Sequence, residues 1–222
     1  MEGIQGRPAC DSRQCSGWAT CCASRKAAKG TGESTLRRPK IAGKVQVYTG
    51  NGKGKTTCAL GAGLRAAGHG LRVLMICFMK AKVAERGAGT EVNYGEFSSI
   101  QRVPNFTIIP VGRSSFVDKE NPDPIDIKMA QEGLRLAQEA LQGHKCDVLI
   151  LDEINVAVEW RLISLEDQLD LIRMKPDDVE VIMTGRYARP EIIEAADLVT
   201  EMKEIKHYYS TEKLLARRGF EF

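Results

Sequence analysis

The sequence predicts an α/β fold of three layers, in which helices cover both faces of a mostly parallel central sheet. Short apolar runs alternate along the chain with segments whose apolar residues recur at helical spacing. Turn residues or helix caps separate most of these segments, and a glycine-rich turn joins the first apolar run to the first helix. Strands that alternate with helices in this way favour a parallel sheet, because each helix carries the chain back across one face.

The first half of the pattern contains three expected strands and one helix. An apolar run at Val45–Tyr48 predicts a buried strand, and the helix after the glycine-rich turn is expected over Cys58–Ala67. After a second turn containing glycine, another strand is expected over Leu71–Phe78. Residues 80–104 are polar and predict a loop, and Phe106–Pro110 predicts a short third strand.

The second half continues the alternation. Apolar residues at helical spacing predict a helix over Ile125–Leu141, and Val148–Leu151 predicts a fully apolar strand. Ser164 is expected to cap a helix whose first turn carries acidic residues. Val179–Met183 predicts another strand. The pattern ends with two further elements, a short helix from Pro190 and a last core strand, Asp197–Met202.

Length and charge limit the class of protein. With 222 residues, the chain suits one domain with a sizeable core. Residues 1–40 carry a net charge of +5 and the whole chain +3, so residues 41–222 carry −2. The globular part therefore lacks the basic charge of a nucleic-acid-binding protein, and we expect no nucleic acid partner. No apolar run approaches the ~20 residues that cross a bilayer, which predicts no membrane span.

Residues 1–40 differ in composition from the rest, and we predict a disordered basic extension there and one folded domain over residues 41–222. The extension lacks the uninterrupted apolar region of a secretory signal, and we expect a cytoplasmic protein. Metal ligation, disulfides and a start codon placed too early are alternative explanations of its four cysteines, Cys10, Cys15, Cys21 and Cys22. Three further cysteines lie in apolar elements and are expected to be buried thiols: Cys58, Cys77 and Cys146.

The glycine-rich turn carries the strongest functional signal. It reads Thr49-Gly50-Asn51-Gly52-Lys53-Gly54-Lys55-Thr56-Thr57, between the first strand and the first helix. Backbone N–H groups of such a turn surround phosphate oxygens, and glycines permit the close approach. Lys55 is expected to reach the phosphates, and the Thr56 hydroxyl to join the ligands of a bound Mg²⁺.

Other interpretations of this turn fit less well. The general phosphate-loop pattern has a glycine where Thr49 stands, so the strict pattern fails by one residue. A flexible hairpin would not need a Lys-Thr pair that enters a helix. A dinucleotide-binding turn needs a glycine where Lys55 stands and an acid that closes the second strand, which instead ends Phe78-Met79-Lys80. We therefore predict a P-loop NTPase (RecA-like) fold.

Two acids follow the apolar strand Val148–Leu151, and they supply the second half of the site. Because ligands of a parallel sheet bind at the carboxyl ends of its strands, Asp152 and Glu153 are expected beside the phosphate loop. Helix capping would explain one acid, whereas an adjacent pair favours a Mg²⁺ site. Arg186 ends another strand at the same edge, where a phosphate contact and a surface position are equally consistent. His207 follows the last strand, and a structural role is the more common one for such a histidine.

Taken in order, these motifs resemble the P-loop family of ATP:corrinoid adenosyltransferases over residues 41–222. The phosphate loop has glycines at positions 50, 52 and 54, and the family shares the departure at Thr49. The later segments that carry the resemblance are Gly68-His69-Gly70, Phe78-Met79-Lys80, Val148–Asn155, Thr184-Gly185-Arg186, Asp197–Met202, Lys206-His207 and Gly219-Phe220-Glu221-Phe222.

The resemblance implies a reaction in which Co(I) of a reduced corrinoid attacks the 5′ carbon of ATP and triphosphate leaves. It implies catalytic roles for Lys55, Thr56 and Glu153, with Mg²⁺ (or Mn²⁺) held by Thr56 and Glu153 and supported by Asp152. It also implies a reductase, such as a flavoprotein, that supplies Co(I), and a homodimer. The residues implied in binding ATP or the corrinoid are Thr49, Gly50, Asn51, Gly52, Lys53, Gly54, Lys55, Thr56, Thr57, Arg186 and Phe116.

Two departures from the family pattern bear on the corrinoid. The loop Gly112-Arg113-Ser114-Ser115-Phe116-Val117 lacks a Gly-Phe-x-Trp sequence, so Phe116 is the single aromatic residue that the resemblance places against the corrinoid. The segment Tyr208–Lys213 lacks an expected glycine. Two other functions stay open on the residues: a RecA-like ATPase or kinase with Glu153 as base, and a nucleotide-binding or corrinoid-carrying module without turnover.

Overall fold

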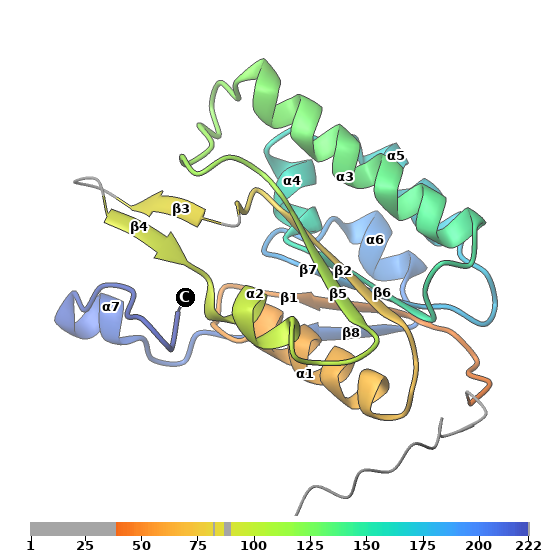
Figure 1. Cartoon of the computed structure of the whole chain (residues 1–222). Coiled ribbons are helices and arrows are strands. Elements are labelled where there is room, and N and C mark those ends of the chain that lie inside the picture. The colour runs from red at the N-terminus through yellow and green to blue at the C-terminus, as the bar shows by residue number, and fades with distance from the viewer. Residues whose placement is uncertain (1–38, 82, 87–89, 222) are drawn as a thin grey trace, which may run out of the picture. The chain divides into compact units, whose positions relative to one another are not determined.

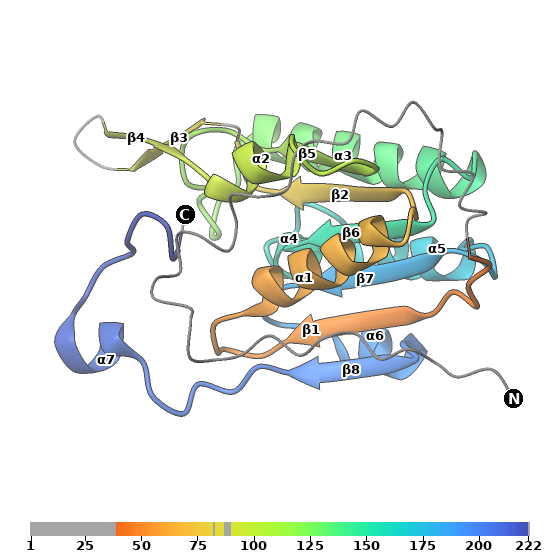
Figure 2. The same ribbon diagram turned by 60° about the horizontal axis from the view of Figure 1, so that its bottom comes forward.

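The sheet follows the predicted class. In this computed structural model, which describes residues 39–81, 83–86 and 90–221, six strands form one parallel sheet. Their order across the sheet is β5-β2-β6-β7-β1-β8, which the turned view in Figure 2 shows more clearly than Figure 1. The strands are β1 (Val45–Thr49), β2 (Val73–Phe78), β5 (Phe106–Val111), β6 (Val148–Asp152), β7 (Glu180–Thr184) and β8 (Leu198–Glu201).

Helices cover both faces, as expected (Figures 1 and 2). One face packs on α1 (Lys55–Gly68) and α2 (Gly95–Ile100). The other packs on α3 (Pro124–Gln142), α4 (Ile154–Glu159), α5 (Leu165–Arg173) and α6 (Pro190–Ala195). Because side chains alternate along a strand, Met75 joins the α1 core and its neighbour Ile76 joins the α3 core. Both side chains are fully buried, so β2 reads as a continuous apolar run.

Caps explain where the two best-marked helices begin. The Asp123 carboxylate accepts a hydrogen bond from the Ile125 amide at 2.9 Å, and Pro124 opens α3 where no amide hydrogen is needed. Ser164 caps α5 as predicted, and Asp167 reciprocates by accepting from the Ser164 amide at 3.3 Å. The sequence therefore specifies these two helix starts directly.

The prediction of a loop over residues 80–104 is wrong in part. An antiparallel hairpin, β3 (Val83–Arg86) and β4 (Thr90–Asn93), precedes α2. Within α2, Phe97 and Ile100 are buried against the sheet. Two apolar residues three positions apart are enough to anchor one helical turn, but they are too few to form a periodic pattern in a polar stretch.

Two burial predictions also fail. The strand β8 was expected in the core, but all four of its residues are exposed among the described residues, with Leu198 at 45%. It lies at the edge of the sheet, where β1 is its one partner among the described strands. Cys58 is exposed on α1, whereas Cys77 and Cys146 are buried as expected. The described helices include none that is long and apolar enough to cross a membrane.

Candidate functional site

A cavity of about 500 Å³ lies at the carboxyl ends of the parallel strands. The phosphate loop and the start of α1 form one wall, with Asn51 to Thr57 among the lining residues. The end of β2, the loop after β5 and Glu153 form the others. Parallel sheets bind ligands at this edge, so the cavity stands where the sequence places the site.

The glycines of the loop are required by its shape. Gly50 and Gly54 have φ angles of +91° and +117°, in the left-handed region that favours glycine. Gly52 is needed for space, because a Cβ there would lie 2.7 Å from the carbonyl oxygen of Met202. The Gly52 amide donates to that same oxygen at 2.6 Å. The loop is thus fitted against the chain that follows β8.

The start of α1 is suited to an anion. Among the described residues no side chain caps the helix, and no acidic residue occupies its first turn. The N–H groups of this turn are therefore free to donate to a ligand, and the positive end of the helix dipole is not neutralised by a carboxylate of that turn. Lys55, Thr56 and Thr57 form this turn and all line the cavity. A phosphate group at this point would meet several N–H donors together.

The Lys55 side chain is buried and bonded to the backbone of the phosphate loop. The residue is only 7% exposed, and Nζ donates to the carbonyl oxygens of Gly50 at 2.8 Å and Gly52 at 2.7 Å. Burial lowers its pKa, the nearby carboxylate of Glu153 acts in the opposite sense, and Arg186 adds to the lowering. The hydrogen-bond partners of Nζ in the described part of the chain are both neutral carbonyl groups, so a phosphate in the cavity would supply this buried ammonium with a negative partner.

Asp152 and Glu153 differ sharply in their surroundings. Asp152 is fully buried: its Oδ2 accepts from Lys80 Nζ at 2.8 Å and its Oδ1 from the Thr184 hydroxyl at 2.7 Å. Although burial acts to lower the pKa of Lys80, the adjacent Asp152 carboxylate raises it, so this lysine stays charged. Glu153 instead lines the cavity. Among the described residues no hydrogen bond or ion pair joins the Glu153 carboxylate.

A chain of contacts holds Glu153 in place. Thr184 donates its hydroxyl proton to Asp152 and accepts from the Glu153 amide at 3.0 Å. Glu153 has a left-handed backbone, with φ at +62°, which is costly for a residue with a side chain. Burial and then the neighbouring Asp152 raise the pKa of Glu153. The Lys80–Asp152–Thr184 chain therefore supports a strained backbone that turns one carboxylate toward the cavity.

The side chains predicted to hold Mg²⁺ offer too few oxygen donors by themselves, so a bound phosphate ligand would have to supply others. Within the described ranges, no three His, Cys, Asp or Glu side chains gather as a metal site. Thr56 and Glu153 both line the cavity and offer a hydroxyl and a carboxylate oxygen, which are donors that Mg²⁺ accepts. Both oxygens of the buried Asp152 already have partners, and its role as a support of the cation stays a prediction.

Other predicted residues are placed around the same cavity. Arg186 lines it and donates to the Asn51 carbonyl oxygen at 3.4 Å. Thr49 ends β1, where its hydroxyl accepts from the Ala188 amide at 3.3 Å and ties the loop to the Arg186 segment. Phe116 lines the cavity with 79% of its surface exposed. An exposed aromatic ring at a cavity mouth is free to cover a flat ligand.

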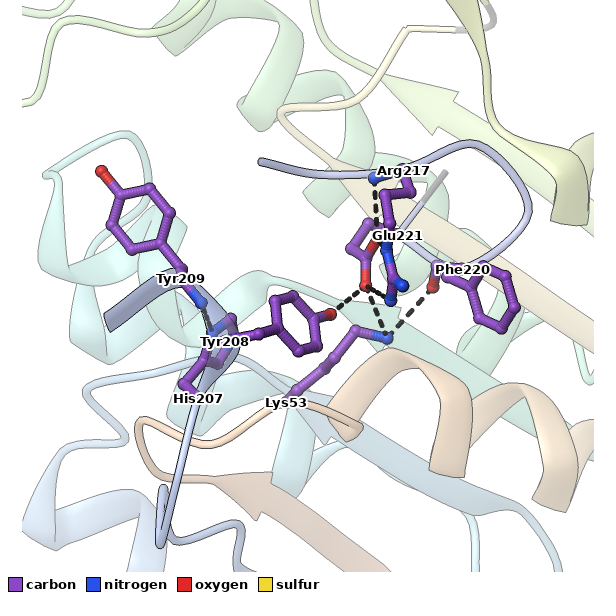
Figure 3. Close-up of polar contacts among 7 residues, drawn as sticks. All are labelled: Lys53, His207, Tyr208, Tyr209, Arg217, Phe220 and Glu221. Carbon is purple, nitrogen blue, oxygen red and sulfur yellow. Dashed lines mark hydrogen bonds and ion pairs between the residues drawn. The ribbon is translucent and has the colours of Figure 1, made fainter. Parts of the chain in front are cut away.

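The sequence reasoning missed several lining residues. Lys80 and Tyr94 lie together, with Lys80 Nζ 5.3 Å from the centre of the Tyr94 ring. Trp160 comes from the region of α4, which the sequence did not predict. The C-terminal residues Phe220 and Glu221 also line the cavity and contact Lys53 (Figure 3). Phe220 and Glu221 belong to the last segment of the family resemblance, but the sequence did not predict that they would lie at the cavity.

The parallel sheet, the helices on both faces and the glycine-rich loop that opens α1 define a P-loop protein of the α/β class. Residues 42–222 match the family described as ATP:corrinoid adenosyltransferase BtuR/CobO/CobP. The chain belongs to that family, which confirms the resemblance found in the sequence.

Curated relatives agree with this assignment. The corrinoid adenosyltransferase of Pseudomonas aeruginosa is 34% identical over 180 residues, covering 81% of this chain and 84% of that protein. The corrinoid adenosyltransferase of Escherichia coli K12 is 33% identical over 168 residues, covering 75% of this chain and 80% of that one. An uncharacterized Nostoc protein is 33% identical over 192 residues, but the match covers only 49% of it, so this chain spans about half of that relative.

Proposed function

We propose that this protein transfers the 5′-deoxyadenosyl group of ATP to Co(I) of a reduced corrinoid and releases triphosphate. An electron pair on cobalt forms the new Co–C bond to the 5′ carbon, while the C–O bond to the triphosphate breaks and its electrons leave with the oxygen. One observation carries the proposal: in this chain, which belongs to the adenosyltransferase family, Glu153 and the phosphate loop line the same cavity.

The loop residues have a clear task in such a reaction. Because the whole triphosphate is the leaving group, negative charge develops at the oxygen that departs, and fixed positive groups lower the barrier. Lys53 and Lys55 line the cavity together with the uncapped start of α1, and this supports their proposed role. The cobalt centre is itself the nucleophile, so the chemistry needs no general base.

Thr56 and Glu153 are proposed to hold the Mg²⁺ or Mn²⁺ that accompanies ATP, with Asp152 behind them as a support. The cation would neutralise part of the triphosphate charge when bound. Glu153 gives this proposal more support than Thr56 does, because none of the described residues pairs with its carboxylate, and an unpaired carboxylate in a cavity is costly to retain unless a ligand uses it. Asn51 and Arg186 are proposed to contact the nucleotide.

The corrinoid is proposed to lie over the loop that carries Phe116, at the open side of the cavity. We further propose a separate reductase, such as a flavoprotein, that delivers Co(I), a homodimeric assembly and a cytoplasmic location. The reductase, the homodimer and the location are proposed from membership in the family alone, and we assign no residues to them.

The test is an anaerobic assay with ATP, Mg²⁺ and chemically reduced cob(I)alamin. We expect a light-sensitive adenosyl-corrinoid spectrum and one triphosphate for each corrinoid converted. ADP and orthophosphate with an unchanged corrinoid spectrum would overturn the proposal and favour an ATPase. Omitting Mg²⁺ and adding a chelator tests the role of the cation in the same assay.

A further inference from the structure

The C-terminal segment returns to the phosphate loop. This segment, residues 207–221, contains α7 (Tyr208–Glu212) and the turn after it. Lys53 Nζ donates to the Phe220 carbonyl oxygen at 3.0 Å and lies 3.5 Å from Glu221 Oε1 (Figure 3). Lys53 is one of the two lysines of the loop, so a carboxylate from the end of the chain is paired with a cation of the anion site.

The carboxylate of Glu221 is held by groups of its own segment. The Tyr208 hydroxyl donates to Glu221 Oε1, and the Arg217 amide donates to Oε2 at 2.7 Å. The Arg217 guanidinium lies 4.8 Å from the ring centres of both Tyr208 and Phe220. The hydrogen bond from Tyr208, and then that from Arg217, hold the pKa of Glu221 at about 2, so it carries its charge at neutral pH. The segment thus presents a preformed anion to Lys53.

The two lysines of the loop are used differently. Lys55 is buried and bonded to loop carbonyls, whereas the Lys53 side chain is 44% exposed and pairs with Glu221. The Glu221 side chain is 16% exposed, so the pair is open to solvent on its lysine side. A partly exposed pair of this kind contributes little and exchanges readily for a stronger partner. A triphosphate at the loop brings several negative charges and is such a partner.

We propose that Glu221 and the polyphosphate of a bound nucleotide are alternative partners of Lys53, so that nucleotide binding releases the C-terminal segment from the loop. This inference concerns the regulation of the proposed nucleotide site and rests on it. It needs anion binding at the loop, but it is independent of the corrinoid and of adenosyl transfer. Phe220 and Glu221 line the cavity, so their release also widens its opening.

The first experiment measures binding of inorganic tripolyphosphate to the full chain by calorimetry. Glu221→Gln is expected to bind about two- to fivefold more tightly than wild type, the factor that loss of an exposed ion pair gives. Glu212→Gln is the matched control, because Glu212 is an exposed glutamate of the same segment, and it should bind as wild type. Equal affinity of Glu221→Gln and wild type, or no binding of tripolyphosphate to either, would overturn the proposal.

A double-mutant cycle separates competition from a general charge effect. If Glu221 acts through Lys53, Glu221→Gln should change the affinity in the wild-type background and leave it unchanged in a Lys53→Met background. The same gain in both backgrounds would mean long-range repulsion and would refute the exchange.

The second experiment needs no variant. Arg217 and Arg218 are exposed, and trypsin cleavage after Arg218 releases residues 219–222, a product that mass spectrometry identifies. Tripolyphosphate is expected to speed this release, and slower release would contradict the proposal. Both experiments omit the corrinoid. Equal affinity of Glu221→Gln and wild type, with tripolyphosphate bound by both, refutes the exchange and leaves adenosyl transfer untouched, whereas absence of tripolyphosphate binding removes the anion site on which both proposals rest. Failure of the anaerobic assay leaves the exchange at Lys53 intact.

Discussion

Replacing Thr184 by valine should weaken both the fold and the site. Thr184 is fully buried at the end of β7, and its hydroxyl joins Asp152 to the Glu153 amide. Valine has almost the same shape but neither donates nor accepts. The substitution therefore leaves packing intact and removes two hydrogen bonds.

The size of the effect follows from the partners. Losing the buried hydrogen bond to the Asp152 carboxylate costs about 1.5–3 kcal/mol, and leaving the partly buried Glu153 amide without an acceptor costs about 1–3 kcal/mol. Allowing for partial relaxation, we expect the free energy of unfolding to fall by about 3–5 kcal/mol. The free energy of unfolding of a native protein is about 5–15 kcal/mol in total. The variant should therefore still fold unless the wild type lies near the lower limit, but it should be measurably less stable.

Urea unfolding followed by circular dichroism measures this difference. Thr184→Ser is the matched control, because it keeps the hydroxyl and loses one methyl group, at a cost of about 1 kcal/mol. If Thr184→Val were as stable as Thr184→Ser, the hydroxyl would not be supporting Asp152 and Glu153, and the reasoning would fail. In the anaerobic assay, Thr184→Val should also turn over more slowly than Thr184→Ser, since Glu153 loses its backbone support.

Three further predictions use other parts of the site and core. Lys55→Ala should lower adenosyl transfer by about 10²–10³-fold, by analogy with removal of one preorganised donor, and a rate near wild type in the anaerobic assay would refute its role. Gly63→Ala should destabilise the protein by about 1–3 kcal/mol, because a Cβ there would lie 2.8 Å from the ring of the buried Phe106. Gly61→Ala, on the same helix, places its Cβ in open space and should stabilise the protein by about 0.5–1 kcal/mol. Thermal unfolding of the two variants and wild type measures both differences. Burial raises the pKa of Cys146 to about 11, so a short iodoacetamide pulse at pH 8 should label the exposed Cys58 and spare Cys146, as read by peptide mass spectrometry.

The fold was predictable because its signals are local and long enough. The strands β2 and β6 are apolar runs, and Ser164 with Asp167 marks a helix start within four residues. The region of β3, β4 and α2 was not predictable, because its anchors are only Phe97 and Ile100 in a polar stretch. Edge and core strands also look alike in sequence, so the exposure of β8 depended on the strand order.

The candidate site was predictable where a motif is continuous in the chain. The phosphate loop and the Asp152-Glu153 pair each occupy one segment, and strand topology brings them to the same edge. The division of labour between the two acids was not predictable. It depends on Lys80, 72 residues away from Asp152 in sequence, and on Thr184, 32 residues away. The contact between Lys53 and Phe220 spans 167 residues, and no local pattern encodes it.

The position of β1 has a consequence for how the protein is made. Within the described part of the chain, the first strand of the sheet pairs with the last two and with no other: Val45 aligns with Val181, and Gln46 aligns with Leu198. The loop that follows β1 then rests on Met202. A chain emerging from the ribosome therefore holds its N-terminal strand unpaired until nearly all of the sheet has been synthesised. The support of the phosphate loop is therefore completed late, and a translation product that stops before residue 198 should lack the contacts that β8 and Met202 make with β1 and the loop.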